Sequence, residues 1–93
     1  MDKDFIETIG FQAVTYLLED ERRLDHLMRE TGLGIQDFQN LSQSPETLAG
    51  VLDFLLSYED LLMGFCEQNN LSPDVPMKVR SHFPGFGGEF QTP

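Results

Sequence analysis

The chain has 93 residues, of which 40% are apolar and 24% are charged. That length fits one small domain, and the apolar content is that of a folded protein rather than a disordered one. Sixteen Asp and Glu against six Lys and Arg give a formal charge of -10, which repels phosphate backbones and argues against nucleic-acid binding.

The cysteine content and the lengths of the apolar runs indicate in which cellular compartment the protein is expected. A single cysteine excludes an intrachain disulfide and favours a reducing environment. No apolar run approaches the ~20 residues of a membrane span, and residues 2–4 are all charged, unlike the start of a signal peptide. We therefore expect a cytoplasmic protein that does not bind membranes.

The first half of the chain predicts two helices and a short third one. Apolar residues recur every three or four positions from 5 to 18, which predicts a helix over about residues 3–19. Asp20 is suited to cap a second helix, and Gly32 is suited to end it, because glycine adopts left-handed backbone at the least cost. The short third helix is expected to carry Ile35, Phe38 and Leu41.

The second half starts with a strong helix signal and is unusually apolar. Ser44 can cap a helix, and Pro45 suits its first position. Eleven of the sixteen residues from 51 to 66 are apolar. One helix over residues 45–69 would be about 37 Å long, longer than the roughly 30 Å diameter of such a domain. We therefore predict a break near Ser57, where residues 57–60 resemble a capping box.

The predicted fold is all-α, a compact orthogonal bundle of five or six short helices. The helix after the break is expected to end at residues 69–70, and Ser72 with Pro73 repeats the start signal for a last helix through Val79 towards Phe83. Residues 1–84 would form one helical domain, followed by a tail over 85–93 that contains Gly and Phe. The expected core is Ile9, Ala13, Leu17, Leu27, Val51, Phe54, Leu55, Leu62 and Phe65.

The two halves of the chain echo each other. A shift of 38 residues lays residues 13–18 over residues 51–56, with matching apolar positions. Periods of this length occur in helical repeat families, so the bundle is interpreted either as two pseudo-repeated three-helix units or as two amphipathic helix pairs that align by chance.

Several short motifs resemble the family catalogued as domain of unknown function 3572. The resemblance covers roughly residues 5–84, and its most specific element is the Val-Leu-Asp-Phe-Leu-Leu block at 51–56. It implies a small, bacterial, helical, intracellular protein and transfers no activity, ligand or site residue. Members tend to finish near Pro84, so the last residues of this chain depart from the pattern. The other matching motifs are residues 7–8, 12–13, 31–33, 59–62, 65–66 and 71–73.

Residues that could carry chemistry are few and scattered. His26, His82 and Cys66 are isolated in sequence and form no metal-binding motif. His26 is interpreted as a surface histidine, and Cys66 as a buried thiol whose neighbour Glu67 would raise its pKa. We therefore expect no enzyme, no catalytic residue, no metal and no cofactor.

Charge segregation is the clearest functional feature. From Glu30 to Met77 there are eight carboxylates and no Lys or Arg. Such a stretch either keeps the domain soluble or attracts a basic protein partner. Phenylalanines in the tail either fold back over the core or form a linear motif for a partner groove. The residues predicted to dock a partner are Asp53, Glu59, Asp60, Glu67, Phe86 and Phe90.

The leading functional hypothesis is a protein–protein interaction or regulatory module without chemistry of its own. The alternative is a small-ligand-binding protein or enzyme with a site in the helical core near Tyr16, His26 or Cys66. A more remote alternative is a nucleic-acid mimic that uses the acidic second half. Homodimerisation is a secondary hypothesis, motivated by the apolar density of residues 51–66.

Overall fold

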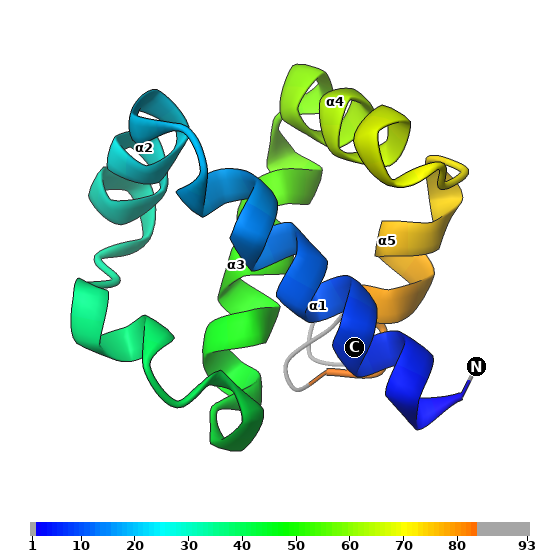
Figure 1. Ribbon diagram of the computed structural model, residues 1–93, viewed down its shortest axis with the longest axis horizontal. Helices are drawn as coiled ribbons and strands as arrows, with labels where there is room; N and C mark the ends of the chain where they lie inside the picture. The colour runs from blue at the N-terminus through cyan, green and yellow to red at the C-terminus, as the bar shows by residue number, and fades with distance from the viewer. Residues whose placement is uncertain (1, 84–93) are drawn as a thin grey trace, which may run out of the picture.

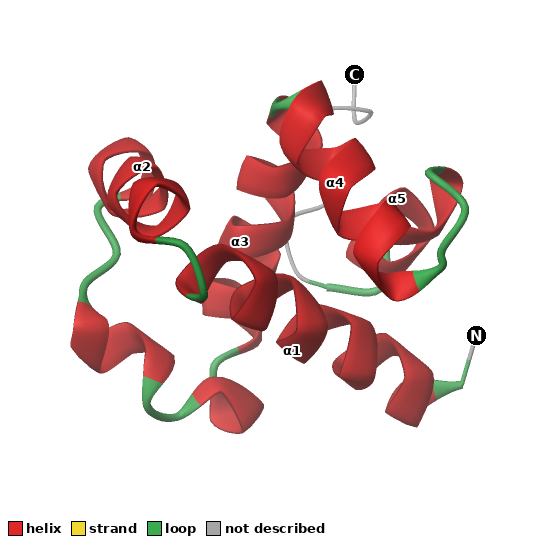
Figure 2. Cartoon of the chain, turned by 45° about the horizontal axis from the view of Figure 1, so that its top comes forward, coloured by secondary structure: helices red, strands yellow, loops and turns green. Residues whose placement is uncertain are grey.

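Two helices cross at the centre of the fold, and the other helices flank them. The computed structural model describes residues 2–83. Helix α1 (Lys3–Leu18) crosses α3 (Pro45–Ser57), with α2 on one side and α4 and α5 on the other (Figure 1). The described residues contain helices, turns and loops but no strand (Figure 2). The remaining elements are α2 (Glu21–Thr31), the 3-10 turns η1 (Ile35–Phe38) and η2 (Leu41–Gln43), α4 (Glu59–Asn69) and α5 (Asp74–Arg80).

The core forms where the apolar faces of α1 and α3 meet. α2, α4 and α5 each add buried side chains to it, including Leu27, Phe65 and Val79. Of the nine core residues expected from sequence, eight are buried, and Leu62 is half-buried at the margin of the core. The all-α bundle is thus confirmed, and α3 is the element that the other four helices share, because it packs against each of them.

The corner between α1 and α2 is fixed by local interactions that the sequence predicted in part. The carboxylate of Asp20 accepts hydrogen bonds from the backbone N–H groups of Arg22 and Arg23, at 2.8 and 3.3 Å. These bonds hold the pKa of Asp20 below its usual value. Arg23 also donates to the carbonyl of Tyr16 at 2.8 Å and lies 3.9 Å above its ring. At the other end of α2, Gly32 has the expected left-handed backbone, with φ of 78°.

The expected short third helix is present as two 3-10 helices, η1 with Ile35 and Phe38 and η2 with Leu41, rather than as one α-helix. The carboxylate of Asp37 accepts a hydrogen bond from the Gly34 N–H at 2.7 Å, which closes η1 as a tight turn. Asn40 then adopts a non-helical backbone, which separates η1 from η2. The 38-residue shift lays η1 over residues 73–76, so the first half has a short 3-10 helix where the second half has the start of α5.

The predicted break near Ser57 is confirmed, but its predicted capping box is wrong. Ser57 is the last residue of α3, and its hydroxyl donates to the carbonyl of Asp53 at 2.8 Å. The extended backbone of Tyr58, with φ of -124°, separates α3 from α4. The start of α5 also differs from the predicted one, because the helix begins at Asp74 and Pro73 is its N-cap residue.

Two glycines give a matched test of how closely α4 packs on α1. A Cβ atom on Gly64 would clash with the hydroxyl oxygen of buried Tyr16, whereas a Cβ atom on Gly50 in α3 would have nothing within 4 Å. Gly64→Ala should therefore lower the free energy of unfolding by about 1–3 kcal/mol through overpacking. Gly50→Ala should raise it by about 0.5–1 kcal/mol, because alanine has the higher helix propensity. Urea unfolding of both variants checks this, and equal effects would contradict the close packing at Gly64.

Candidate docking surface

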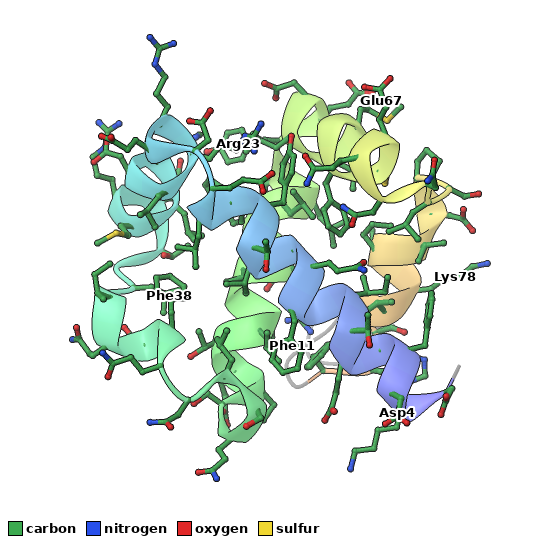
Figure 3. All side chains as sticks on the ribbon, in the orientation of Figure 1. Asp4, Phe11, Arg23, Phe38, Glu67 and Lys78 are labelled. Atoms are coloured by element: carbon green, nitrogen blue, oxygen red, sulfur yellow. The ribbon has the colours of Figure 1, made fainter. Side chains whose placement is uncertain are left out.

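The outer side of α4 carries carboxylates around one exposed methionine. Glu59, Asp60, Met63 and Glu67 are all exposed. At 3.6 residues per turn they share a sector of about 100° on the helix, opposite buried Phe65. We call these four residues the α4 acidic face. Figure 3 shows Glu67 pointing away from the rest of the molecule. The structure thus brings three of the predicted docking residues onto one surface.

The charges of this face are not neutralised within the part of the chain that the structure describes. No Lys, Arg or His nitrogen of residues 2–83 lies within 4.0 Å of the three carboxylates. Some carboxylates elsewhere are paired, since Asp25 lies 2.8 Å from Arg29 on α2 and Asp74 lies 2.9 Å from Lys78 on α5. Part of the local acidity is explained by the α4 N-terminus, where the helix dipole favours Glu59 and Asp60, but that account does not extend to Glu67 in the last turn.

Asp53 belongs to a different environment from the other predicted docking residues. It lies on α3, and its two carboxylate oxygens accept hydrogen bonds from Arg80 at 2.7 and 3.0 Å. Arg80 is buried, and it also donates to the carbonyl of Phe83 at 3.1 Å. The charge of Asp53, which has no Lys or Arg near it in sequence, is therefore compensated in the fold, because α5 brings Arg80 to it from 27 positions further along the chain. Phe86 and Phe90 lie outside the described residues.

His26 is part of an aromatic cluster rather than a free surface histidine. Its ring packs edge-on against Phe54 and Tyr58, with centroids 4.8 and 4.6 Å apart. Its Nε2 lies 3.6 Å from a carboxylate oxygen of Glu30, which also accepts a hydrogen bond from the Tyr58 hydroxyl. That hydrogen bond raises the pKa of Tyr58. The polar groups of the cluster thus bind one another and join α2 to the α3–α4 corner.

Cys66 is buried, as expected, and its surroundings do not activate it. Burial raises the pKa of its thiol, and the negative charge of Asp74 adds to this effect. The contributing carboxylate is thus Asp74 and not the neighbouring Glu67. The thiol lies 3.8 Å from the carbonyl oxygen of Ser72, so it packs under the α4–α5 connection and is poorly suited to act as a nucleophile.

A groove lies at the other end of α3 from the α4 acidic face. It has a volume of about 530 Å³ and is formed by the first half of α1, by η2 and the start of α3, and by the residues after α5. Neither Tyr16 nor Cys66 lines it. Its lining is a mixture of apolar and polar side chains, which are Lys3, Ile6, Glu7, Leu41, Ser42, Pro45, Leu48, His82 and Phe83.

Residues 2–83 contain neither a cluster of metal-ligand side chains nor a membrane-spanning helix. No three His, Cys, Asp or Glu side chains of this part of the chain are placed so that they could hold a metal ion. Among the same residues, the helices are too short or too polar for any of them to cross a membrane.

Comparison with known proteins places the chain in a family. The model of a family described as "Protein of unknown function (DUF3572)" matches residues 3–86. The chain belongs to this family. The match to DUF3572 extends past Pro84 and includes Phe86, whereas the sequence resemblance was expected to finish earlier. No curated protein and no solved structure matches the chain. A bacterial origin, a cytoplasmic location and homodimerisation stay predictions.

Proposed function

We propose that this DUF3572 protein is an interaction module without catalytic chemistry, and that it docks a basic protein through the α4 acidic face. The observation that carries the proposal is the contrast between α4 and its neighbours. Glu59, Asp60 and Glu67 form no ion pair within the described residues, whereas Asp25 of α2, Asp53 of α3 and Asp74 of α5 each pair with an Arg or a Lys. A basic partner would supply the missing charges.

Met63 gives the face an apolar centre. It is 48% exposed and lies between the carboxylates on the helix surface. Interfaces gain most of their affinity from such apolar anchors, whereas surrounding charges mainly set the association rate and the choice of partner. Methionine is also well suited to partners of varied shape, because its side chain is unbranched and polarisable. The face therefore combines a source of affinity with a source of specificity.

Reversing two charges tests the proposal directly. The double variant Glu59→Lys/Asp60→Lys should lower the association rate with a captured partner several-fold, and this rate should fall with added salt for the wild type, because exposed charges are screened beyond about 8 Å at physiological ionic strength. The partner is captured by crosslinking in a lysate of the source organism and purified. Its association is then followed by surface plasmon resonance at several salt concentrations.

The matched control is Asp2→Lys/Asp4→Lys at the start of α1. This variant makes the same change in net charge, and both of its carboxylates are exposed at a helix N-terminus. It should associate at close to the wild-type rate. If both double variants slow association equally, overall charge and not the α4 acidic face attracts the partner. If neither variant slows it, the carboxylates serve solubility.

A further inference from the structure

The groove beside α1 offers an apolar floor with charged groups at its margin. Ile6 and Leu48 are buried beneath it, and Leu41 is half-buried at its side. Lys3, Glu7 and His82 add polar atoms, and none of the three forms an ion pair within residues 2–83. The volume of about 530 Å³ lies in the range of sites that hold small ligands or a few side chains.

Phe83, the last residue that the structure describes, lies at this groove, and residues 84–93 follow it in the chain. Phe83 is half-buried, lines the groove and packs against the core. Its backbone is held by two hydrogen bonds to Arg80, since its N–H donates to the Arg80 carbonyl at 3.0 Å and its carbonyl accepts from the Arg80 guanidinium at 3.1 Å. The next residues of the chain therefore start from a fixed point on the groove wall.

We propose that the groove is a docking site for the C-terminal segment of this same chain, residues 84–93, with Phe86 and Phe90 as its apolar anchors. The sequence of the segment contains these two phenylalanines, a single charged residue, Glu89, and three glycines. Aromatic side chains suit an apolar floor, and Glu89 has the opposite charge to Lys3 at the margin.

The length of the segment fits this assignment. An extended chain covers at most about 3.3–3.6 Å per residue, so the Cα atom of Phe86 lies within roughly 11 Å of that of Phe83, and that of Phe90 within roughly 25 Å. Attachment at the groove wall gives the segment a high effective concentration there, which an unattached peptide or ligand lacks. Glycines at 85, 87 and 88 let the backbone turn back towards the wall at no steric cost.

Methyl NMR of the full chain tests the proposal. Nuclear Overhauser contacts are expected between the rings of Phe86 or Phe90 and methyl groups of Ile6, Leu41 or Leu48. Methyl groups of Met63 and Met77, which are exposed outside the groove, should show no such contact. Phe86→Ala and Phe90→Ala should shift the groove methyl resonances, whereas Gln91→Ala should leave them in place.

Each outcome of the NMR experiment either supports or overturns docking of residues 84–93 in the groove of the same chain. Contacts that persist on dilution, and that are absent between differently labelled molecules in a mixed sample, support docking within one chain. Contacts found only between differently labelled molecules would overturn it in favour of a second copy. An absence of ring contacts at the groove methyls in the wild-type chain would also overturn it, whatever the stability of the variants.

Discussion

Replacing Phe65 with Ala is expected to lower the free energy of unfolding by about 3–5 kcal/mol. The Phe65 side chain is fully buried on the inner side of α4, and its ring meets the ring of Tyr16 edge-on with centroids 5.7 Å apart. The variant loses this aromatic contact and leaves a cavity between α4 and α1. A small domain is stabilised by about 5–15 kcal/mol in total, so the change is large. Urea unfolding followed by circular dichroism measures it.

Met63→Ala is the control for this prediction. Met63 lies on the same helix but on its exposed side, so its truncation should change the free energy of unfolding by no more than about 0.5 kcal/mol. If Phe65→Ala and Met63→Ala unfold at the same urea concentration as the wild type, α4 does not pack on the core as described.

Replacing Asp53 with Ala is expected to lower the free energy of unfolding by about 2–3 kcal/mol. The side chain of Arg80 is only 5% exposed, and the variant removes the carboxylate that accepts two of its hydrogen bonds. Breaking a pair that is buried on both sides costs about 3–5 kcal/mol. We expect less here, because the Asp53 side chain is 57% exposed. Thermal and urea unfolding both measure the loss.

A second substitution separates the charge from other effects of the Asp53 change. In Asp53→Ala/Arg80→Met the buried cation is gone, so much of the lost stability should return. The matched control is Glu67→Ala, which removes an exposed carboxylate outside any ion pair of the described residues and should unfold like the wild type. A double variant that is less stable than Asp53→Ala would show that Arg80 stabilises the fold independently of Asp53.

The observed helix boundaries agree with the predicted ones wherever the sequence carries a local signal for a helix end. The cap at Asp20 and the left-handed turn at Gly32 were predicted from neighbouring residues, and they are confirmed. The break after Ser57 is also confirmed, but it was predicted mainly from the excess length of a single helix over residues 45–69, and the local capping box expected there is absent. The segment over 35–43 was predicted less well, because a short polar-rich run favours turns and helix almost equally. There the chain forms two 3-10 helices, and the Gly34 N–H donates to the Asp37 carboxylate at the start of the first one.

The candidate surface was predicted only in part. Helical spacing was enough to place Glu59, Asp60 and Glu67 on one side of α4, since it depends on a single helix. The partner of Asp53 was missed, although Lys78 and Arg80 are visible in the sequence as the first cations beyond the acidic stretch. An acidic residue within an apolar helix, followed by such a cation, is the signal that could have suggested the pair.

The sequence by itself therefore determined the helices, their boundaries to within a residue or two, and most of the core. Capping, helical periodicity and backbone preference act between residues a few positions apart, and they need no tertiary structure. Only the tertiary structure decided that Asp53 is neutralised by Arg80, that His26 packs against Phe54 and Tyr58, and that a groove opens beside α1. Each of these depends on the distance between segments far apart in the chain, and that distance is fixed only when α1 and α3 cross.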